Sequence, residues 1–342
     1  MTSLVTGAAG FLGSHLTTLL AARGGQTRAL VHPTRDAGWQ APGGVEVYHA
    51  DIADKSAVAP ALDGVDTVFH CAALTGPWGP PAEYHRVNVA GLETMVRAAM
   101  AARVRRFVHV SSITVHGNDV RGAADEDAPL RAEPNPYSRT KVAGELLLGR
   151  MIADEGAPVT IVRPGWIYGP GDAASLGRFA TMIASRQMIV VGTGRNHVPL
   201  AYVGDVAAGM LLASSAERAA GRAYLLLNDE PVTQGEFLAA IAAELGTAPP
   251  SRSIPYRAGV LAGGAAETVW KLARRKQAPP VMRYGLQLLG GENRFSIARA
   301  RHELGFSPAI SYTEGVRRAI AWYREARLGA AAVTGPAAEV LT

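Results

Sequence analysis

Short runs of β-branched and apolar residues alternate along the first half of the chain with longer segments of helical spacing. This alternation is typical of βαβ units wound into a parallel sheet. Strands are predicted at Ser3–Thr6, Thr27–Val31, Val45–Ala50, Thr67–Cys71, Arg106–Ser111 and Val159–Arg163. Helices are predicted at Gly13–Ala22, Ser56–Leu62, Val87–Ala102 and Tyr137–Glu155. Because such sheets bind ligands at the carboxyl ends of their strands, functional residues are expected just after each strand.

The pattern changes after Pro164, where Gly-Pro loops and a short helix at Ser175–Arg186 precede a strand near His197–Val203 and a helix from Asp205. Later helices are predicted at Thr233–Leu245, Arg257–Arg274 and Ser311–Arg324. We therefore predict an α/β fold, a Rossmann-type doubly wound parallel sheet with a smaller, mostly helical C-terminal substrate lobe. The Rossmann domain is expected over 1–165 with re-entry at about 197–227, the lobe over 166–196 and 228–326, and a disordered tail over 327–342.

The composition is that of an ordinary globular protein, with 342 residues, 48% hydrophobic and 18% charged. The net charge of +5 comes from scattered basic residues, so no nucleic-acid partner is expected. The single cysteine, Cys71, allows no intramolecular disulfide, and the nine histidines lack metal-ligand spacing, so no metal site is predicted.

Neither a signal peptide nor a membrane span is predicted, which suits a cytoplasmic location. The most apolar later stretch, Ala258–Trp270, is interrupted by two adjacent glycines and by Glu267. It is too short and too broken to span a bilayer, although it suits contact with an apolar ligand or with lipid.

The chain opens with Gly7, Gly10 and Gly13 spaced three apart at the first strand-to-helix junction. Gly7 permits a tight turn, Gly10 lets the backbone approach a pyrophosphate, and Gly13 allows close packing of helix on strand. The spacing differs from the usual Gly-x-Gly-x-x-Gly fingerprint, and a glycine turn without a ligand is the alternative. The position at the first junction favours dinucleotide binding.

The choice of cofactor depends on the end of the second strand, where an acidic residue would accept from a ribose 2′-hydroxyl. His32 and Arg35 stand there instead, which favours NADP(H) over NAD(H), with an exposed loop charge as the alternative interpretation of Arg35. Further positions expected at the cofactor are Ala9, Phe11 and Leu12 in the glycine loop, Asp51 and Ile52 after the third strand, and Cys71, Ala72 and Ala73 after the fourth.

Tyr137 and Lys141 lie four residues apart, on one face of a predicted helix. A nearby cation lowers the pKa of a phenol from its usual value of about 10, which makes proton exchange with an alcohol or ketone feasible. Ser112 closes the fifth strand, where its hydroxyl is placed to bond the reacting oxygen. A surface helix with one buried ring and a turn-capping serine are the alternatives, and the combination of the three residues favours catalysis.

Taken together, these motifs resemble the extended short-chain dehydrogenase/reductase family, also called the NAD-dependent epimerase/dehydratase superfamily. The matching residues are Thr6–Gly13, Asn88, Ser112, Tyr137, Lys141 and Arg163–Gly165. The resemblance implies that Tyr137 is the general acid/base, that Lys141 modifies its pKa and binds the ribose, and that Ser112 orients the carbonyl. It further implies a second hydroxyl at Thr114, a framework role for Asn88, cofactor contacts at Tyr137, Lys141, Pro164, Gly165 and Ile167, and a homodimer formed through the helices Val87–Ala102 and Tyr137–Glu155.

The stretch Arg163–Asp172 is similar to that of 3β-hydroxysteroid dehydrogenase-like members and of 2-alkyl-3-oxoalkanoate reductases. Nucleotide-sugar members often carry an arginine shortly before the residues corresponding to Tyr202–Val206, and here only Arg195 offers a partner for a diphosphate. The resemblance therefore implies an NAD(P)-dependent oxidoreductase acting on a small hydrophobic ketone or alcohol, either sterol-like or a long-chain 3-oxo compound. A nucleotide-sugar epimerase or dehydratase and a non-catalytic NAD(P)-binding regulator are the alternatives. Candidates for the substrate wall are Trp78, Trp166, Tyr168 and Met182, with the core of the lobe as the alternative for each.

Overall fold

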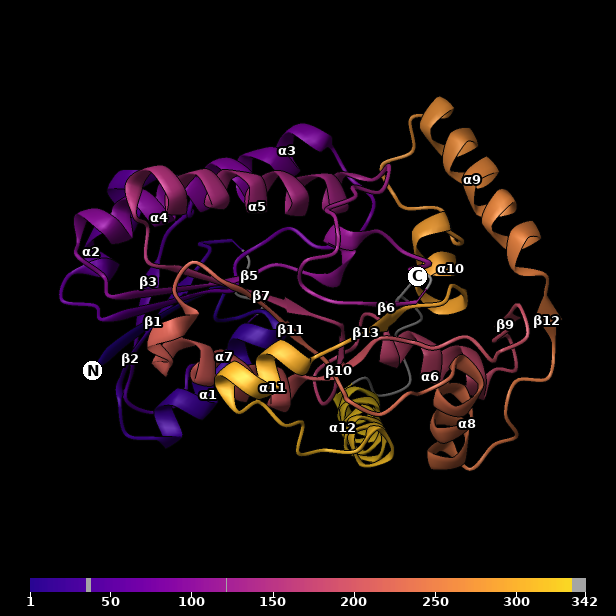
Figure 1. The fold of residues 1–342 in the computed structure, drawn as a ribbon. Coiled ribbons are helices and arrows are strands. Elements are labelled where there is room, and N and C mark those ends of the chain that lie inside the picture. Colours follow the sequence, from indigo (N-terminus) through magenta and orange to yellow (C-terminus); the bar gives the residue numbers. More distant parts are fainter. Residues whose placement is uncertain (35–37, 121, 334–342) are drawn as a thin grey trace.

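The computed structural model describes residues 1–34, 38–120 and 122–333. Its centre is a parallel sheet of seven strands in the order β11-β7-β5-β4-β1-β2-β3 (Figure 1). The strands are β1 (Thr2–Thr6), β2 (Gln26–Val31), β3 (Val45–His49), β4 (Thr67–His70), β5 (Arg106–Val110), β7 (Val159–Pro164) and β11 (Ala223–Leu226). The order in which the first strand lies next to both the second and the fourth is that of a doubly wound Rossmann sheet, so the predicted fold class is confirmed.

Helices cover both faces of this sheet (Figure 1). One face carries α1 (Phe11–Ala22), α7 (Val203–Ser215) and α11 (Ala298–Leu304), and the other carries α2 (Lys55–Leu62), α4 (Leu92–Ala101) and α5 (Pro136–Glu155). Successive strand residues point to opposite faces, so Val5 and Val108 pack in the first core whereas Leu4 and Phe107 pack in the second. Strands covered on both sides need continuous apolar runs, which is the pattern that the sequence shows.

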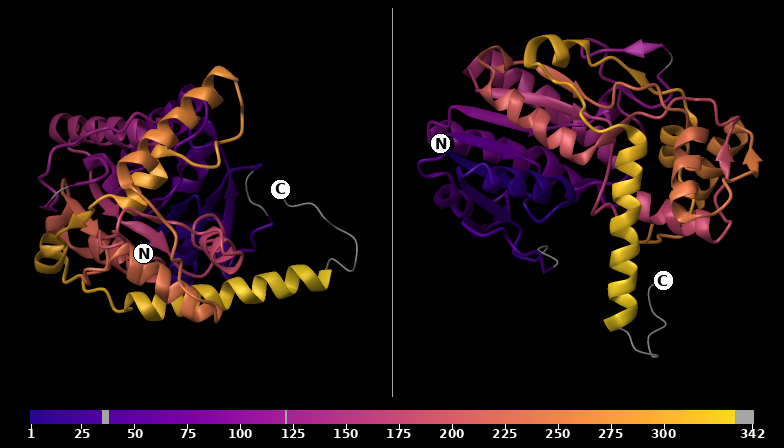
Figure 2. Two further views of the ribbon diagram at one scale, coloured as in Figure 1. Left: turned by 90° about the vertical axis from the view of Figure 1, so that its right-hand side faces the viewer. Right: turned by 90° about the horizontal axis from the view of Figure 1, so that it is seen from below.

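A third core holds the lobe together, centred on Tyr168, Phe237 and Ile320. Its helices are α6 (Leu176–Ala184), α8 (Gln234–Leu245), α9 (Tyr256–Leu272), α10 (Arg283–Gly290) and α12 (Tyr312–Val333). Figure 2 shows α9 standing out from the body on one side and α12 extending beyond it on another. The remaining elements are α3 (Pro81–His85), the π-helix η1 (Arg86–Gly91), the 3-10 helices η2 (Ile113–His116) and η3 (Glu217–Ala219), and the short strands β6 (Ala123–Ala124), β8 (Trp166–Tyr168), β9 (Val190–Val191), β10 (Leu200–Tyr202), β12 (Ser253–Ile254) and β13 (Arg294–Phe295).

The region after Pro164 differs in detail from the sequence prediction. The strand expected near His197–Val203 forms as β10, but it pairs with β8 in a separate two-stranded sheet, and β11 is the strand that rejoins the main sheet. The predicted helix Val87–Ala102 is interrupted because its first turn is the π-helix η1. The short helices α10 and α11 were not predicted, since each is too brief to show a helical repeat.

The C-terminal tail is also more ordered than its composition suggested. Helix α12 continues to Val333, so residues 327–333, predicted to be disordered, are helical. Alanine has the highest intrinsic helix propensity, and an Ala-rich extension of an existing helix needs no new nucleation. Residues 334–342 lie outside the described residues, as does Arg35.

The glycine loop between β1 and α1 is held by close backbone contacts. Gly7 has a φ of +64°, its N–H donates to the carbonyl of Leu30 at 3.0 Å, and a Cβ added to it would lie 2.8 Å from the backbone of Ala72. A Cβ on Gly13 would lie only 2.1 Å from the carbonyl oxygen of Gly7. The loop therefore passes under the end of β4 in a form that only glycine permits at these positions.

We predict that Gly13→Ala lowers the free energy of unfolding by roughly 2 kcal/mol or more, because the new methyl group would meet a backbone oxygen that cannot move independently. Gly149→Ala, within α5, is the matched control, since nothing lies within 4 Å of its added Cβ. That variant should be more stable by about 0.5–1 kcal/mol. Urea denaturation followed by circular dichroism measures both, and equal stability of the two variants would contradict this account of the loop.

Candidate active site

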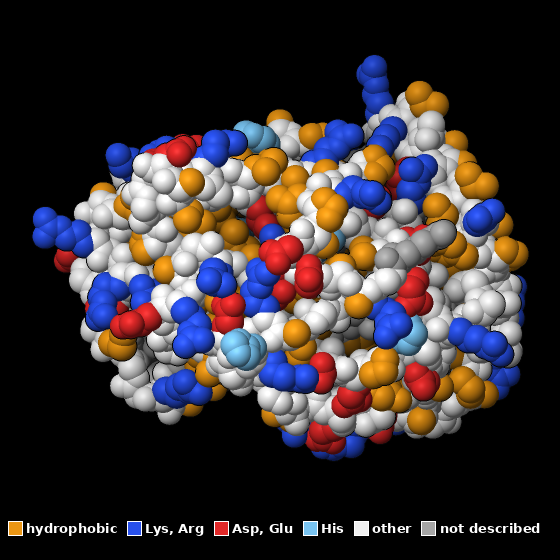
Figure 3. Space-filling model, viewed as in Figure 1, with side chains coloured by type: hydrophobic (Ala, Val, Ile, Leu, Met, Phe, Trp, Pro, Cys, Tyr) orange, Lys and Arg blue, Asp and Glu red, His pale blue; other side chains and the backbone are white. Residues whose placement is uncertain are grey.

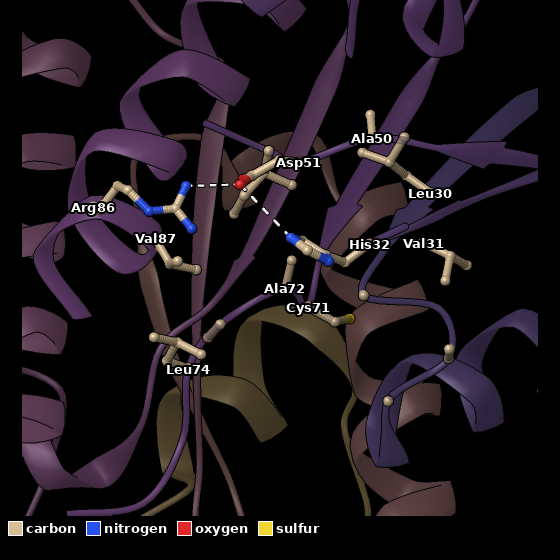
Figure 4. Close-up of a pocket in the computed structure, with 15 residues that line it drawn as sticks. Leu30, Val31, His32, Ala50, Asp51, Cys71, Ala72, Leu74, Arg86 and Val87 are labelled. Carbon is tan, nitrogen blue, oxygen red and sulfur yellow. Dashed lines mark hydrogen bonds and ion pairs between the residues drawn. The ribbon is translucent and has the colours of Figure 1, made fainter. Parts of the chain in front are cut away.

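A cavity of about 200 Å³ opens at the carboxyl ends of β1, β2, β3 and β4 (Figure 4). The structure brings together there the predicted residues Gly7, Ala9, Gly10, His32, Asp51, Ile52, Cys71, Ala72 and Ala73. Its wall also contains Leu30, Val31, Ala50, Leu74, Arg86 and Val87, which were not predicted. This wall suits a dinucleotide. The backbone of Gly7 and Gly10 is accessible to a phosphate, and the small side chains of Ala72 and Ala73 leave room for a ribose.

Asp51 is the polar centre of this cavity. Arg86 and His32 approach it from opposite sides, with Arg86 Nη1 at 2.7 Å and His32 Nε2 at 3.6 Å from Asp51 Oδ2 (Figure 4). Burial raises the pKa of Asp51, but hydrogen bonds from the N–H of Ala53 and from Arg86 outweigh burial and lower it. Asp51 is therefore an anion in the cavity wall, with one oxygen accepting from the N–H of Ala53 and the other from Arg86.

Arg86 is the residue that the sequence analysis missed most clearly. Its guanidinium also binds the Glu83 carboxylate at 2.8 Å, so it links α3 to the end of β3. The only signal in the sequence was its position two residues before Asn88, the residue by which that segment was matched to the family.

Several residues predicted at the cofactor lie outside the cavity wall. Leu12 belongs to the core beneath the loop, and Phe11 packs edge-on to His15 at 5.6 Å between ring centroids. Gly165 donates from its N–H to Leu226 O at 3.1 Å, and a Cβ on it would lie 2.2 Å from Pro199 O. Pro164 ends β7, and Ile167 packs partly buried against the core.

Ser112, Tyr137 and Lys141 meet between the ends of β5 and α5. Helix α5 begins where Asn135 accepts from the N–H of Ser138 at 2.9 Å, with Pro136 in its first turn, and this start sets the direction of Tyr137. The ammonium of Lys141 donates to Val110 O at 2.7 Å and lies 5.8 Å from the centroid of the Tyr137 ring. Ser112 shares a hydrogen bond with Tyr137 and also caps η2, where its hydroxyl accepts from the N–H of Thr114 at 3.2 Å.

The electrostatics of this trio differ from the sequence prediction. Burial raises the pKa of Tyr137, and the hydrogen bond with Ser112 opposes this only in part. The ammonium of Lys141 lies over the ring and is bonded to a backbone carbonyl, so in this geometry it does not lower the pKa of the phenol as expected. Burial lowers the pKa of Lys141 itself to about 8, against the opposing effect of Glu145. Near neutral pH the phenol therefore keeps its proton and the lysine its charge.

A buried ion pair lies directly beneath this trio. Arg163 on β7 binds Glu145 on α5 at 2.6 Å, with side-chain exposures of 7% and 3%. Glu145 also accepts from the hydroxyl of Ser111 at 2.5 Å, and Nη1 of Arg163 lies 3.2 Å from Nε2 of His116. Glu145 follows Lys141 by one helical turn, a spacing visible in the sequence, but the sequence could not show that this face is buried.

Asn88 and Thr114 occupy supporting positions. The amide of Asn88 accepts from the N–H of Leu74 at 2.7 Å and donates to Leu74 O and Thr140 Oγ1, each at 3.0 Å. It thereby ties η1 both to the loop after β4 and to α5. The hydroxyl of Thr114, a residue 2% exposed, makes no hydrogen bond within the described part of the chain.

The residues suggested for the substrate wall lie mostly in the lobe. Tyr168 is 1% exposed and packs against Tyr202 and Phe237, which leaves it no surface for a substrate. Trp166 stacks edge-on against Phe179 and Phe237, and Met182 packs on the same core. Trp78, on the loop after β4, donates from its ring N–H to Lys276 O at 3.1 Å.

Tyr284, on α10, is a residue near the trio that the sequence analysis did not single out. Burial raises the pKa of its phenol, and the Tyr137 and Glu133 side chains add to that effect. The lobe therefore contributes a second phenol within electrostatic range of Tyr137.

Within the described residues, no group of three or more His, Cys, Asp or Glu side chains is arranged to hold a metal ion. Over the same residues, the helices are all too short or too polar to cross a bilayer.

The sheet, the cavity and the adjoining trio define a dinucleotide-binding oxidoreductase of the Rossmann type. The model of the NAD dependent epimerase/dehydratase family matches residues 3–226, and the chain belongs to that family. The resemblance drawn from the sequence motifs is thereby confirmed.

The curated relatives are reductases and dehydrogenases. A 2-alkyl-3-oxoalkanoate reductase from Stenotrophomonas maltophilia (strain K279a) is 32% identical over 93% of this chain and 98% of its own length. A 4-hydroxy-2-methyl-3-oxo-4-farnesyl-3,4-dihydroquinoline-1-oxide ketoreductase from Stigmatella aurantiaca is 32% identical over 92% of this chain and 95% of its own. A 3 beta-hydroxysteroid dehydrogenase/Delta 5-->4-isomerase from Mycobacterium tuberculosis (strain ATCC 25618 / H37Rv) is 30% identical over 94% and 90%. The chain is accordingly an NAD(P)-dependent dehydrogenase or reductase.

Two solved structures extend the comparison. The crystal structure of gox2253 superposes with a TM-score of 0.80 at 30% identity, covering 95% of this chain and 98% of that one. A UDP-glucose 4-epimerase from Thermus thermophilus in complex with NAD gives a TM-score of 0.76 at 25% identity, covering 95% and 100%. Members of this fold thus include an NAD complex whose name specifies a sugar-nucleotide substrate.

We predict that Glu145→Gln lowers the free energy of unfolding by about 3 kcal/mol, because it leaves the buried guanidinium of Arg163 without its counter-charge. Glu155→Gln is the matched control on the same helix, since Glu155 also pairs with an arginine, Arg97, at 2.9 Å, but in solvent. Exposed pairs contribute little, so the control should unfold almost as the wild type does. Chemical denaturation of the two variants decides the matter, and equal midpoints would refute the proposed weight of the buried pair.

Proposed function

We propose that this protein is an NADP(H)-dependent ketone reductase acting on a hydrophobic substrate, either sterol-like or a long-chain 3-oxo compound. The observation that carries the proposal is the group of Ser112, Tyr137 and Lys141. Ser112 and Lys141 are buried, Tyr137 is half-buried and keeps its proton, and Lys141 lies within electrostatic range of Cys71 in the cavity wall. A proton donor of that kind suits the conversion of a ketone to an alcohol.

The chain's own residues account for the proton and for the position of the carbonyl. Ser112 donates a hydrogen bond to the substrate carbonyl oxygen, and Tyr137 transfers its proton to the same oxygen as negative charge develops there. Lys141, charged below its pKa of about 8, keeps a positive charge 5.8 Å from the centroid of the Tyr137 ring, beside the phenol that gives up its proton. A nicotinamide cofactor, when bound, would supply the hydride for the carbonyl carbon.

The cofactor would lie against Gly7, Gly10, Asp51 and Ala72, with its pyrophosphate at the start of α1. His32 at the end of β2 supports the phosphorylated form, because a protonatable ring stands where NAD-specific sheets carry a carboxylate. Arg35, three residues further on, is proposed as the second cation for the 2′-phosphate.

The surroundings of His197 and the names of the relatives support an apolar substrate over a sugar nucleotide. His197, which precedes β10, is paired with Glu292 at 2.7 Å, so a diphosphate arriving there would face a carboxylate. Arg195 lies exposed on the preceding turn. The relatives named as reductases of a 2-alkyl-3-oxoalkanoate and of a farnesyl quinoline point in the same direction. With a single unpaired cysteine, Cys71, the protein suits the cytoplasm.

We predict that Tyr137→Phe reduces kcat for ketone reduction by roughly 10²–10⁴-fold, because the proton donor is removed. NADPH affinity should fall by no more than roughly tenfold, since one hydrogen bond is worth about 1 kcal/mol. Tyr48→Phe is the control, as Tyr48 bonds Glu46 outside the cavity. NADPH or NADH oxidation is followed optically with steroid ketones, 3-oxo acids and sugar nucleotides, and cofactor binding by nicotinamide fluorescence.

The outcomes separate the alternatives. Undiminished reduction by Tyr137→Phe would remove the proton route. Turnover confined to sugar nucleotides would favour an epimerase or dehydratase, and cofactor binding without turnover of any substrate would favour a regulatory protein.

We also propose a homodimer formed through α4 and α5. These helices lie side by side on one outer face of the molecule (Figure 1). Leu146, on α5, is 53% exposed there, an unusual place for a large apolar side chain unless a partner covers it. A two-fold axis would set this face against its own copy.

We predict that the wild type sediments as a dimer and that Leu146→Glu shifts it toward monomer, because the substitution places two like charges near the axis. Val47→Glu, at the outer edge of the sheet, serves as control because Val47 is 38% exposed away from these helices. Sedimentation velocity measures both, and a wild-type monomer would exclude the interface.

A further inference from the structure

Helix α9 carries an unbroken apolar stripe on its solvent side. Leu261, Val269 and Leu272 are 73%, 56% and 80% exposed, and nearby Val281 is 46% exposed. Alanines fill the gaps between the large side chains, so that the exposed stripe consists of Ala258, Leu261, Ala262, Ala265, Val269 and Leu272. Spacings of three and four residues place all six on one face of the helix.

The opposite face of α9 explains why this stripe points outward. Gly259 and Gly263 are buried against α10, and a Cβ on Gly263 would lie 2.8 Å from the backbone nitrogen of Arg283. Glu267 accepts from that same N–H at 2.7 Å. The helix is thus held to the body by small residues, its one carboxylate and the partly buried Tyr256, whereas Leu261, Val269 and Leu272 are left in solvent.

Basic residues gather at the C-terminal end of the stripe. Lys271, Arg274, Arg275 and Lys276 are all exposed, and none pairs with a carboxylate among the described residues. Lys271 lies 5.9 Å from the ring centroid of Trp78, which fixes this end of α9 to the loop after β4. Figure 3 shows apolar side chains along the edge of the molecule over α9, and basic ones gathered at its upper end.

We propose that α9 docks this protein on an anionic membrane surface, with the stripe of Leu261, Val269 and Leu272 entering the interface and the basic cluster binding lipid phosphates. Charge complementarity favours this occupant over a second copy of the chain, because lipid phosphates can pair with the basic cluster. A second copy of α9 offers only the carboxylate of Glu267, which already accepts from the N–H of Arg283. An amphipathic helix with an apolar face and adjacent lysines and arginines binds in the plane of a bilayer without crossing it.

Because α9 lies near the candidate active site, docking it on a membrane would bring that site close to the lipid. Helix α10, which packs on α9, carries Tyr284 within electrostatic range of Tyr137. Lys276, just after α9, accepts from the ring N–H of Trp78, which lies on the loop that also contributes Leu74 to the cavity wall. A docked α9 would therefore hold the active-site region near the lipid phase. The docking itself stands on the geometry of α9 and does not depend on the proposed substrate.

Sedimentation with lipid vesicles tests the proposal without any catalytic assay. We expect the wild type to bind phosphatidylcholine vesicles that contain phosphatidylglycerol and to bind pure phosphatidylcholine weakly. Leu261→Gln/Leu272→Gln and, separately, Arg274→Glu/Arg275→Glu should each lower the partition coefficient roughly tenfold or more, since a basic residue near an anionic surface contributes about 1 kcal/mol.

The matched control for charge is Arg23→Glu/Arg218→Glu, which changes the net charge equally at exposed positions outside α9. It should bind vesicles as the wild type does, and circular dichroism checks the fold of every variant. Absence of wild-type binding, or equal loss in the control, would overturn the proposal. A concentration-dependent dimer that Leu261→Gln/Leu272→Gln abolishes would assign the stripe to a second copy instead.

Discussion

The ion pair between Arg163 and Glu145 is the constraint on which the active-site geometry depends. Two charges nearly without solvent are stable only if their hydrogen bonds are satisfied, and here Ser111, His116 and the backbone of Glu126 complete the set. The pair fixes α5 to β7 and β5 together. Helix α5 therefore cannot slide along the sheet, and the side chains one and two turns before Glu145 keep their positions at the end of β5.

A second link couples this helix to the cofactor side of the sheet. Asn88 bonds the loop after β4 through Leu74, which lines the cavity, and bonds α5 through Thr140, the neighbour of Lys141. A displacement of the loop after β4 would thus be transmitted to α5 through one amide. The cavity wall and the helix that carries Tyr137 and Lys141 are therefore parts of one hydrogen-bonded framework.

Sequence reasoning located the parts of the site that follow from local rules. The glycine loop, Ser112 and the pair of Tyr137 and Lys141 lie where strand ends and helical spacing put them. It failed where tertiary burial decides the outcome. The direction of the pKa of Tyr137 was wrong because the depth of burial cannot be read from spacing, and Tyr168 resembled a wall residue although the lobe core encloses it. Strand β10 was assigned to the wrong sheet because pairing partners leave no local signal.

The π-helix η1 makes the site sensitive to chain length in a particular way. A π turn holds one residue more than an α turn, and the extra residue sets the angular phase between Arg86 and the helix that follows. Deleting a single residue from η1 would restore regular α-helical geometry, but it would rotate the preceding residues by about 100° about the helix axis. Arg86 would swing away from Asp51, and the amide of Asn88 would lose Leu74 or Thr140. The additional residue of the π-helix thus lets Arg86 reach Asp51 while Asn88 bonds Leu74 and Thr140.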